Sequence, residues 1–565
     1  MGRTVAIGIQ DFEKIRRGNY FYVDKTDFIR EWWESGDDET LIARPRRFGK
    51  TLNISMLEYF FSVNYKDRGD LFEGLSIWND EKYRQLQGTY PVISLSFASV
   101  KERNFEMTRK KICQLIANLY DKNSFLLSSG VMKENDIRYF KRVSEEMDDS
   151  DASLSLHQLA DYLSRYYGKK VIILLDEYDT PMQEAYVNGF WNEIVAFTRS
   201  LFNSTFKTNP YLERAIMTGI TRVSKESIFS DLNNLEVVTT TSDEYASAFG
   251  FTEKEVFAAL DECGYSDQKK CVKQWYDGFI FGHTGNIYNP WSILNYLDEQ
   301  QYTTYWANTS ANSLVAKLVR EGNRNIKSKF EKLLCGECIW SEIDEQIVYN
   351  QLNGNERAVW SLLLASGYFK VLSYEKYKDI PEGTEPKYQL TLTNLEVKLM
   401  FNRMIHDWFA MARPDYNDFI KAMFAGDVDA MNEYMNRVAL QTFSYFDTGE
   451  RASGAEPERF YHGFVLGLLV DLQDKYYLKS NRESGFGRYD VMLEPKNPGK
   501  DNAVIMEFKV RSTRKEKSLE ETAQSAIEQI KERKYSEELK MRGIAEEQIK
   551  EYGFAFEGKT VLIVD

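Results

Sequence analysis

One segment, Thr40–Thr51, constrains the fold of this chain more than any other. It reads Thr-Leu-Ile-Ala-Arg-Pro-Arg-Arg-Phe-Gly-Lys-Thr, so an apolar run is followed by a basic loop and then by a helical pattern that starts near Lys50. A strand, a loop and a helix in this order bring backbone amides to a helix N-terminus, which is a favourable place for phosphate oxygens. Lys50 can neutralise the outer phosphates, and the hydroxyl of Thr51 can bind magnesium. The segment therefore predicts a P-loop site for ATP with Mg²⁺.

The loop departs from the standard phosphate-loop pattern at one position. The pattern has a glycine five residues before Gly49, and this chain has Arg44 there. Arg44, Arg46 and Arg47 could hold phosphates or could face an acidic surface of a partner, and the sequence leaves both alternatives open. The loop residues expected to contact the nucleotide are Arg46, Arg47, Phe48, Gly49, Lys50 and Thr51.

A second apolar run, Val171–Glu177, ends in the adjacent carboxylates Asp176 and Glu177. In P-loop ATPases an aspartate at this place acts on the metal side, and a glutamate polarises the attacking water. We therefore expect Asp176 and Thr51 to bind magnesium and Glu177 to be catalytic. The simpler interpretation is a core strand whose charged end emerges into solvent, but the phosphate loop upstream favours the catalytic one.

A third run, Arg214–Thr218, leads into the polar turn Gly219–Ser224. Ligands of open α/β sheets gather at the carboxyl ends of the strands. Thr218 or Thr221 could therefore sense the γ-phosphate, and Arg222 could stabilise its developing charge. A polar turn with a solvated arginine explains the same residues equally well, so the sequence leaves both interpretations open.

Strand-like and helical patterns alternate through the first 245 residues. The alternation predicts an α/β fold, with the parallel sheet of a P-loop NTPase flanked by helices. At 565 residues the chain is too long for one hydrophobic core, and its length indicates roughly three to four domains. The expected strands are Thr40–Ala43, Pro91–Phe97, Lys170–Leu175 and Glu213–Thr218.

We expect four domains: an AAA-like P-loop ATPase domain over 1–245, a helical lid or adaptor over 246–345, a winged-helix-like module over 346–445, and a C-terminal α/β domain over 446–565. In the lid, Thr252 is expected to cap a helix and Glu255 to complete its capping box. Winged-helix units can bind DNA, but we favour packing against the ATPase. The expected elements of this module are a helix over 358–365, strands over 368–372 and 388–392, and a helix over 396–411.

The sequence of the C-terminal domain contains a second set of candidate metal-binding carboxylates. A turn-rich stretch that contains Asp490 precedes the apolar run 503–510, and the two are expected to form a hairpin. Period-two alternation puts Glu507 and Lys509 on one face of the second strand, with Asp490 available from the first. Two carboxylates and a lysine can hold Mg²⁺, orient water and stabilise a pentavalent phosphate, which is the chemistry of metal-assisted phosphodiester hydrolysis.

Residues around this pattern extend the expected site. Glu458, a further candidate metal ligand, and His462 lie four apart on an expected helix, so both could face the site. Gln529 and Tyr535 on a later helix are candidate secondary contacts. A charged pair on an exposed strand explains Glu507 and Lys509 as well as catalysis does. The best local basic run, suited to a nucleic-acid backbone, comprises Lys509, Arg511, Arg514, Lys515 and Lys517.

Composition limits the class of partner. The formal net charge of −14 argues against attraction of the whole chain to nucleic acid or to an anionic membrane. Five cysteines form a sparse and odd set that fits a reducing cytosol, and the start of the chain has no signal-peptide core. We expect a soluble, cytoplasmic protein. Cys335 and Cys338 have metal-ligand spacing, but without a second pair a structural zinc is the weaker interpretation.

Together the motifs resemble a bacterial family of AAA-ATPase-like proteins whose chains end in a domain of the PD-(D/E)XK nuclease superfamily. The resemblance implies that arginine at position 44 is a family trait, and it maps the nuclease signature onto Asp490, Glu507 and Lys509. It covers nearly the full length and rests on Gly8–Phe12, Tyr22–Thr26, Arg44–Lys50, Asp176–Pro181, Ser227–Ser230, Leu232–Leu235, Phe249–Thr252, Trp275–Gly278 and Tyr288–Trp291.

The leading hypothesis is an ATP-binding and ATP-hydrolysing regulatory protein that controls a metal-dependent nuclease domain acting on DNA or RNA. The alternative is a nucleotide-dependent switch, or a remodelling ATPase that assembles as an oligomer, whose nuclease-like domain only binds nucleic acid or protein.

Overall fold

In the computed structural model the chain divides into two compact units: unit 1 comprises Met1–Leu314 and Cys338–Val397, and unit 2 comprises Val315–Glu337 and Lys398–Asp565. The structure describes residues 3–222, 229, 232, 234–307, 315, 318, 324–334, 336–344, 352, 355–381, 383–410, 416–442, 465, 469, 472, 475–480, 483–484, 487–488, 490–498, 500–511, 516–557 and 560–565.

Unit 1 is built around a five-stranded sheet in the order β2-β3-β4-β1-β5, in which all neighbouring strands are parallel. This arrangement confirms the expected α/β fold with a parallel sheet. Each strand runs within two residues of its predicted bounds where one was predicted. The strands are β1 (Glu39–Ala43), β2 (Val92–Ser96), β3 (Val171–Asp176), β4 (Leu212–Gly219) and β5 (Leu235–Val238).

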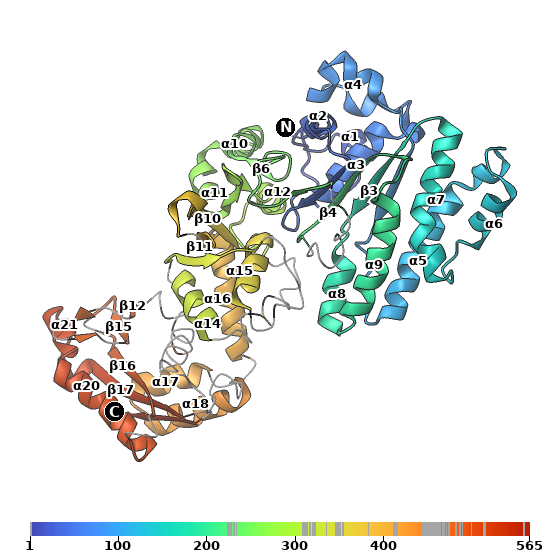
Figure 1. Ribbon diagram of the computed structural model, residues 1–565. Coiled ribbons are helices and arrows are strands. Elements are labelled where there is room, and N and C mark those ends of the chain that lie inside the picture. The colour runs from blue at the N-terminus through green and yellow to red at the C-terminus, as the bar shows by residue number, and fades with distance from the viewer. Residues whose placement is uncertain are drawn as a thin grey trace. The chain divides into compact units, whose positions relative to one another are not determined.

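Helices cover both faces of this sheet, which explains why β1 and β3 are buried along their whole length and read as continuous apolar runs. Figure 1 shows α3 on one side of β3 and β4, with α7 and α9 on the other. The helices are α1 (Phe12–Arg17), α2 (Asp27–Ser35), α3 (Lys50–Phe61), α4 (Glu81–Leu86), α5 (Phe105–Lys122), α6 (Glu134–Arg142), α7 (Asp149–Tyr167), α8 (Thr180–Asn188) and α9 (Trp191–Phe206).

The segment 250–299 is not purely helical, which differs from the expected helical lid. Its strands form a small antiparallel sheet in the order β6-β8-β7, while α10 carries the predicted capping box of Thr252 and Glu255. Residues 277–281 and 284–288 pair as an antiparallel hairpin, which the helical periodicity of the surrounding sequence did not predict. The elements are β6 (Phe251–Thr252), α10 (Glu253–Glu262), α11 (Lys269–Tyr276), β7 (Asp277–Phe281), β8 (Thr284–Tyr288) and α12 (Pro290–Glu299).

The helix–strand–strand–helix pattern predicted over 358–411 is present in the structure, and a further strand joins it to make a sheet in the order β10-β11-β9. Helix α16 begins at the predicted residue to within one position and contributes the buried carboxylate Glu396. The elements are α14 (Arg324–Leu334), β9 (Ile339–Glu342), α15 (Glu356–Ala365), β10 (Phe369–Tyr374), β11 (Lys387–Leu392) and α16 (Leu395–Ala410).

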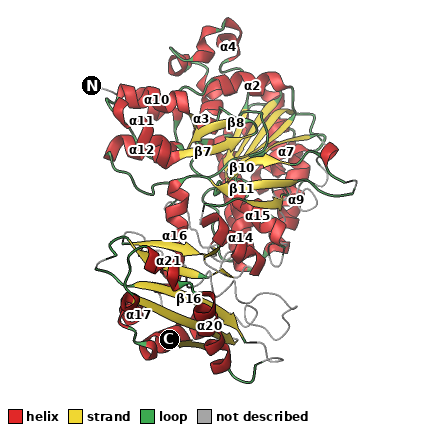
Figure 2. Ribbon diagram, turned by 90° about the vertical axis from the view of Figure 1, so that its left-hand side faces the viewer, coloured by secondary structure: helices red, strands yellow, loops and turns green. Residues whose placement is uncertain are grey.

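Unit 2 contains a mixed sheet in the order β12-β15-β16-β17-β18, in which only the β16–β17 pair is parallel. The strands and α20 are drawn in Figure 2. The predicted hairpin is the β15–β16 pair. The elements are α17 (Tyr416–Ala425), α18 (Val428–Thr442), β12 (Tyr476–Ser480), β13 (Glu483–Ser484), β14 (Gly487–Arg488), β15 (Val491–Pro495), β16 (Ala503–Val510), α20 (Leu519–Arg533), α21 (Ser536–Met541), β17 (Ile549–Glu557) and β18 (Thr560–Val564).

Helices also cover both faces of the sheet in unit 2. Val504, Met506 and Phe508 of β16 belong to a core with α17 and α18. Ala503 and Ile505 belong to a second core with α20. The period-two alternation of a strand therefore turns Glu507 and Lys509 toward the α20 side.

Candidate functional site

The loop between β1 and α3 has the backbone shape that a phosphate loop requires. Gly49 has φ of 84° directly before α3, and Arg47 has φ of 66°, an uncommon value for a residue with a side chain. The helix then starts at Lys50, so its first backbone N–H groups are directed toward the carboxyl edge of the sheet.

Lys50 is buried inside this loop. Its ammonium donates to the backbone carbonyls of Arg44 and Pro45, both at 3.0 Å. Burial lowers the pKa of Lys50, and the carboxylates of Glu177 and Asp176 act against that shift. The negative charges at the end of β3 therefore act on the Lys50 ammonium, and its role in neutralising phosphates stays a prediction.

Asp176 connects three strands and the phosphate loop at the carboxyl edge of the sheet. It accepts hydrogen bonds from the hydroxyls of Thr51 at 2.8 Å, Thr218 at 2.6 Å and Ser96 at 3.4 Å. Burial raises the pKa of Asp176, while the hydroxyls of Thr218 and Thr51 oppose that rise. The hydroxyl and carboxylate oxygens of Thr51 and Asp176 are hard ligands, so this donor set fits magnesium.

Glu177 has a strained backbone. Its φ of 50° lies in the left-handed region, which costs a residue with a Cβ on the order of 1 kcal/mol or more. The carboxylate accepts a hydrogen bond from the hydroxyl of Thr180 at 3.1 Å. Strain of this kind clusters at functional sites, and the sharp turn after Asp176 gives Glu177 a different direction from that of a strand residue.

Arg44 occupies the glycine position of the standard pattern, and its side chain is completely buried. The guanidinium donates to the carbonyl of Ala43 at 3.2 Å, to that of Glu244 at 3.0 Å and also to that of Thr239. It lies 4.5 Å from the ring centre of Phe281. Burial lowers the pKa of Arg44 to about 9. Of the two alternatives from the sequence, the structure supports neither for this residue, because Arg44 binds backbone carbonyls of its own unit.

The other two arginines differ from Arg44 in exposure. Arg46 is half-buried and donates to the side-chain carbonyl of Gln183 at 3.0 Å. Arg47 is exposed and stacks over the ring of Trp291 at 4.2 Å from the ring centre. Both guanidinium groups thus contact side chains of unit 1.

Residues 279–306, which follow β5 in the chain, contact the phosphate loop. The carbonyl of Arg46 accepts from the side chain of Asn289 at 3.2 Å and from the indole of Trp306 at 3.0 Å. Phe48 is buried with its ring 4.8 Å from that of Phe279 and 5.4 Å from that of Phe281. Sequence analysis missed the roles of Asn289 and Trp306, although Asn289 stands in one of the motifs that carry the family resemblance.

The turn after β4 is anchored by a buried carboxylate, Asp179, which sequence analysis did not single out. Its Oδ2 accepts from the backbone N–H groups of Ile220 and Thr221, both at 3.0 Å, and from the hydroxyl of Thr221 at 2.9 Å. Thr218 and Thr221, the predicted phosphate sensors, therefore bond to Asp176 and Asp179, respectively.

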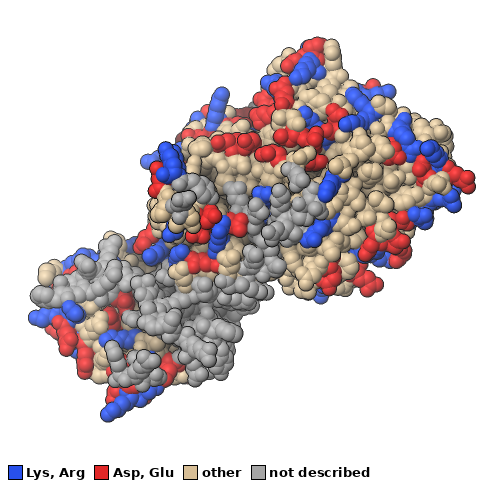
Figure 3. All heavy atoms as spheres, in the orientation of Figure 1, with Lys and Arg blue, Asp and Glu red and all other residues tan. Residues whose placement is uncertain are grey.

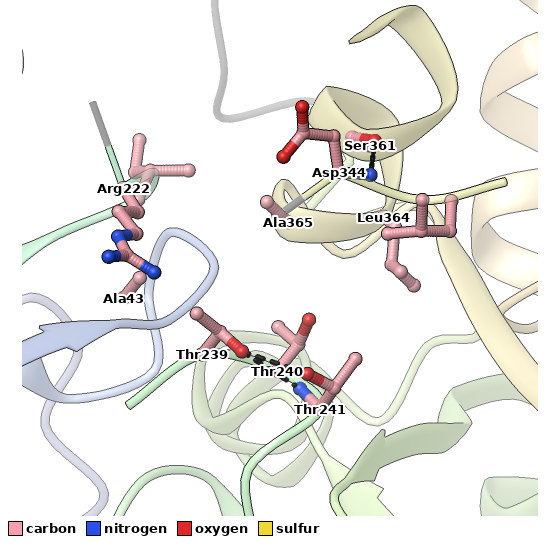
Figure 4. A pocket seen from close by; sticks show the side chains of 11 residues that line it. Ala43, Arg222, Thr239, Thr240, Thr241, Asp344, Ser361, Leu364 and Ala365 are labelled. Carbon is pink, nitrogen blue, oxygen red and sulfur yellow. Dashed lines mark hydrogen bonds between the residues drawn. The ribbon is translucent and has the colours of Figure 1, made fainter. Parts of the chain in front are cut away.

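Arg222 lines a small cavity on the β5 side of β1 (Figure 4). The opposite wall of the cavity carries Asp344 and the α15 residues Ser361, Leu364 and Ala365. The cavity measures about 20 Å³, which is room for about one water molecule rather than for a nucleotide. Arg222 is thus placed beside β1, Thr239 and Asp344, while Lys50 is enclosed by the phosphate loop.

In unit 2, the predicted nuclease residues come from two neighbouring strands and α20. Asp490 precedes β15 and accepts a hydrogen bond from the backbone N–H of Phe508 at 2.9 Å. Glu507 is buried and accepts from the side-chain amide of Gln529, and Lys509 donates to the hydroxyl of Ser525 at 2.8 Å. The structure therefore brings Asp490 to β16 and places Glu507 and Lys509 against α20.

Tyr535, which follows α20, interacts electrostatically with both carboxylates. Burial raises the pKa of Tyr535, the amide of Gln529 opposes that rise, and the negative charges of both Glu507 and Asp490 add to it. Carboxylate oxygens from Asp490 and Glu507 fit a hard divalent cation such as Mg²⁺. Within the described ranges, no group of three or more His, Cys, Asp or Glu side chains is arranged to hold a metal ion.

Several predicted residues lie outside the described part of the chain: Glu458, His462, Arg514, Lys515 and Cys335. Cys338 is a free thiol. In the predicted basic run, Arg511 forms an ion pair with Glu557 at 2.7 Å, and Lys517 is exposed.

Acidic and basic side chains are interspersed over the face of unit 1 that Figure 3 shows. In the described ranges, no helix is long and apolar enough to span a membrane.

Comparison with known proteins finds two domains, the ATPase-like domain and the nuclease-superfamily domain that the motifs of the sequence resemble. Residues 6–229 match the family described as "Predicted AAA-ATPase", and residues 456–565 match the PD-(D/E)XK nuclease superfamily. The chain is also 25% identical over 555 residues to an "Uncharacterized protein in vnfD 5'region" of Azotobacter chroococcum mcd 1, and the match covers 96% of this chain and 94% of the relative.

Proposed function

The chain carries an AAA-ATPase-like domain followed by a domain of the PD-(D/E)XK nuclease superfamily, and from this premise we propose that it hydrolyses ATP and uses its nucleotide state to control a nuclease. The observation that carries the ATPase half is the contact of Thr51 with Asp176 at 2.8 Å beside the buried Lys50. It joins the start of the phosphate-loop helix α3 to the acidic end of β3, as ATP hydrolysis requires.

Each residue of the ATPase site has a proposed role. Lys50 binds the outer phosphates, and Thr51 and Asp176 would hold magnesium, which would supply Lewis-acid stabilisation of the phosphate charge. Glu177 takes a proton from the attacking water, for which its position at the end of β3 is suited. Thr218 keeps the Asp176 carboxylate in one orientation through its hydroxyl at 2.6 Å.

The proposed nuclease residues are Asp490, Glu507 and Lys509. The two carboxylates would hold a divalent ion, which would supply a Lewis acid for the phosphodiester. Lys509 stabilises negative charge on the phosphate, and Ser525 and Gln529 keep Lys509 and Glu507 in place. DNA and RNA share the phosphodiester that this chemistry attacks, so either one is a candidate substrate.

Control of the nuclease by the nucleotide requires a link from the phosphate loop to the rest of the chain. It is supported by the contacts of Asn289 and Trp306 with the backbone of the phosphate loop. A nucleotide that changes the shape of this loop changes the energy of those contacts, and so it biases the segment that follows the ATPase sheet in the chain.

The test uses the purified full chain with single-stranded and double-stranded DNA and RNA, Mg²⁺ or Mn²⁺, and no nucleotide, ADP or ATP. We expect ATP hydrolysis that Lys50→Ala removes, and cleavage that depends on nucleotide state and that Lys509→Ala removes. Lys500→Ala, an exposed lysine of the same unit, is the matched control and should cleave as wild type does.

Three results would separate the parts of the proposal. Cleavage at the same rate without nucleotide, with ADP and with ATP would refute regulation by the nucleotide but not the nuclease activity. Binding of nucleic acid without any cleavage would favour a non-nucleolytic switch. A rate of ATP hydrolysis per subunit that rises with protein concentration, together with an oligomer in light scattering, would favour a remodelling machine.

A further inference from the structure

Asp179 is a buried carboxylate that the proposed chemistry does not use. It follows β3 and precedes α8, and only 1% of its surface is exposed. Three of its hydrogen bonds come from Ile220 and Thr221, in the turn after β4. A buried carboxylate needs this number of donors, and burial raises the pKa of Asp179 in spite of them. Asp179 is therefore fixed to the end of β4.

Gln183 lies one helical turn after Asp179 and extends this network. Its side-chain nitrogen donates to Asp179 at 3.1 Å, and its side-chain oxygen accepts from Arg46 at 3.0 Å. The two neighbours fix the orientation of the amide, because a flipped amide would place its oxygen against a carboxylate and its nitrogen against a guanidinium. Gln183 thus connects the acidic group of one strand end to a cation of the phosphate loop.

Arg46 is held at its backbone as well as at its guanidinium. Asn289 and Trp306 donate to its carbonyl, while Gln183 accepts from its Nη2. The charge of Arg46 also opposes protonation of Lys50, so the two cations lie near each other in the same loop. Ordering an arginine side chain costs considerable rotamer freedom, and these contacts offset that cost for Arg46.

The side chain that contacts the Arg46 guanidinium is the neutral amide of Gln183 and not a carboxylate. A carboxylate at position 183 would form an ion pair with the guanidinium and neutralise it. Gln183 instead places a neutral amide between Asp179 and Arg46, so Arg46 is oriented but keeps its full positive charge. An oriented, unneutralised cation beside Lys50 is suited to an anionic ligand of high charge, such as a triphosphate.

We propose that Arg46 contacts the terminal phosphate of the bound nucleoside triphosphate and stabilises the charge that develops there, and that Gln183 and Asp179 are its positioning residues. This inference rests on the proposed ATPase function. It assigns the charge-stabilising role to Arg46 rather than to Arg222, which lines the cavity beside β5.

In the reaction, a water oxygen bonds to the γ-phosphorus, and the bond from that phosphorus to the bridging oxygen of ADP breaks. The electron pair of this bond stays on ADP, and the water proton passes to Glu177 and then to solvent. The products are ADP and inorganic phosphate. Negative charge grows on the bridging oxygen and the γ-phosphate oxygens during the transfer, and this is the charge that an arginine stabilises.

Steady-state ATP hydrolysis by the full chain tests the inference. Arg46→Ala should lower kcat about 100-fold or more while KM for ATP changes much less, because the contact strengthens in the transition state. Guanidinium ion added to Arg46→Ala should restore part of the lost turnover. Arg84→Ala, an exposed arginine of α4, is the matched control and should behave as wild type.

Variants of Gln183 test the positioning role. Gln183→Leu removes both hydrogen bonds at similar volume and should lower kcat about tenfold with little change in KM. Gln183→Glu keeps a partner for Arg46 but neutralises it, and it also faces Asp179, so its kcat should fall at least as far. Gln85→Leu, at an exposed glutamine of α4, is the control, and unchanged thermal unfolding of each variant shows that the fold is kept.

The outcomes distinguish this inference from the proposed function. If wild type hydrolyses ATP and Arg46→Ala keeps the wild-type kcat, the inference is wrong and the ATPase proposal stands. A raised KM with unchanged kcat would likewise overturn it, because Arg46 would then only bind the ground state. A wild-type protein that hydrolyses no ATP would remove the proposed function and this inference with it.

Discussion

Replacing Glu396 by glutamine should remove a pH-dependent loss of stability from unit 1. The Glu396 side chain is fully buried at the start of α16. Its two oxygens accept from the hydroxyl of Ser292 at 2.8 Å and from the backbone N–H groups of Trp306 at 2.6 Å and Ala307 at 3.3 Å. Burial raises the pKa of Glu396 from 4.5 to about 7 in spite of these bonds.

The sign and size of the effect follow from proton linkage. The folded protein holds this proton more tightly than the unfolded chain, so the stabilisation from Glu396 is complete below pH 4.5 and is lost as the pH rises through 7. A change in pKa from 4.5 to about 7 corresponds to about 3 kcal/mol, at about 1.4 kcal/mol for each tenfold change in proton affinity. Most of this loss falls between pH 5 and pH 8.

Glutamine at position 396 can keep the same bonds without a titrating group. Its oxygen can accept from Trp306 and Ala307, and its nitrogen can donate to the hydroxyl of Ser292. The assay is urea unfolding at pH 5, 6, 7 and 8, followed by tryptophan fluorescence, with each resolved transition of this multidomain chain fitted separately.

The comparison between wild type and Glu396→Gln isolates this residue from Glu39, whose pKa is also raised to about 7 by burial. We expect the variant to gain on the order of 2 kcal/mol over wild type between pH 5 and pH 8. A constant difference in free energy of unfolding across this range would refute the reasoning, since it would show that Glu396 does not titrate there.

Other predictions test packing, capping and the second site. Phe48→Ala should destabilise unit 1 by about 3 to 5 kcal/mol in urea unfolding, because its ring is buried between two others; a loss below 1 kcal/mol would show that the loop is not held by this packing. Thr252→Ala should cost about 1 kcal/mol in the same assay by removing the N-cap of α10, whereas no change would mean that the cap is replaced by water. Gln529→Leu should lower nucleic-acid cleavage at least tenfold at saturating Mg²⁺ by releasing Glu507, and wild-type cleavage by this variant would contradict the placement of Glu507.

The strands of the ATPase sheet could be predicted because each is a short apolar run that is buried on both faces. Val171–Asp176 is such a run, and the two carboxylates that follow it mark where the strand ends. The strand β5 and the hairpin of β7 and β8 were not predicted. Each of these strands spans five residues or fewer, and a window that short fits a helix as well as a strand.

Local spacing could likewise predict that Lys50 and Thr51 start the helix after the phosphate loop, that Asp176 ends a strand, and that Glu507 and Lys509 share one face of a strand. Each of these features lies within a single loop or strand. Local spacing could not predict the contacts of Arg46, since these come from positions 183, 289 and 306. A contact across more than 100 residues leaves no periodic signal in a single sequence. Asn289 and Asp179 stand in motifs that carry the family resemblance, but a motif does not say what its residues touch.

Arg44 shows why one departure from a motif should be interpreted through its contacts. Restoring the standard pattern with Arg44→Gly would remove a fully buried guanidinium that binds the carbonyls of Thr239 and Glu244 and lies against Phe281. Those carbonyls belong to the turn after β5, so the side chain ties the phosphate loop to the next strand end. Buried acceptors without a partner cost about 1 to 3 kcal/mol each, and the added glycine increases the freedom of the unfolded chain.

Arg44→Gly should therefore lower the free energy of unfolding of unit 1 by at least about 2 kcal/mol, although it creates the more common phosphate-loop sequence. Urea unfolding and nucleotide binding measured on the same preparation provide the test, with Arg84→Gly at an exposed position of α4 as the control. If Arg44→Gly is as stable as wild type and binds ATP more tightly, the arginine is an obstacle to the nucleotide rather than a support for the loop. Loss of stability in Arg44→Gly alone would mean that this loop uses a buried cation where other phosphate loops use the flexibility of glycine.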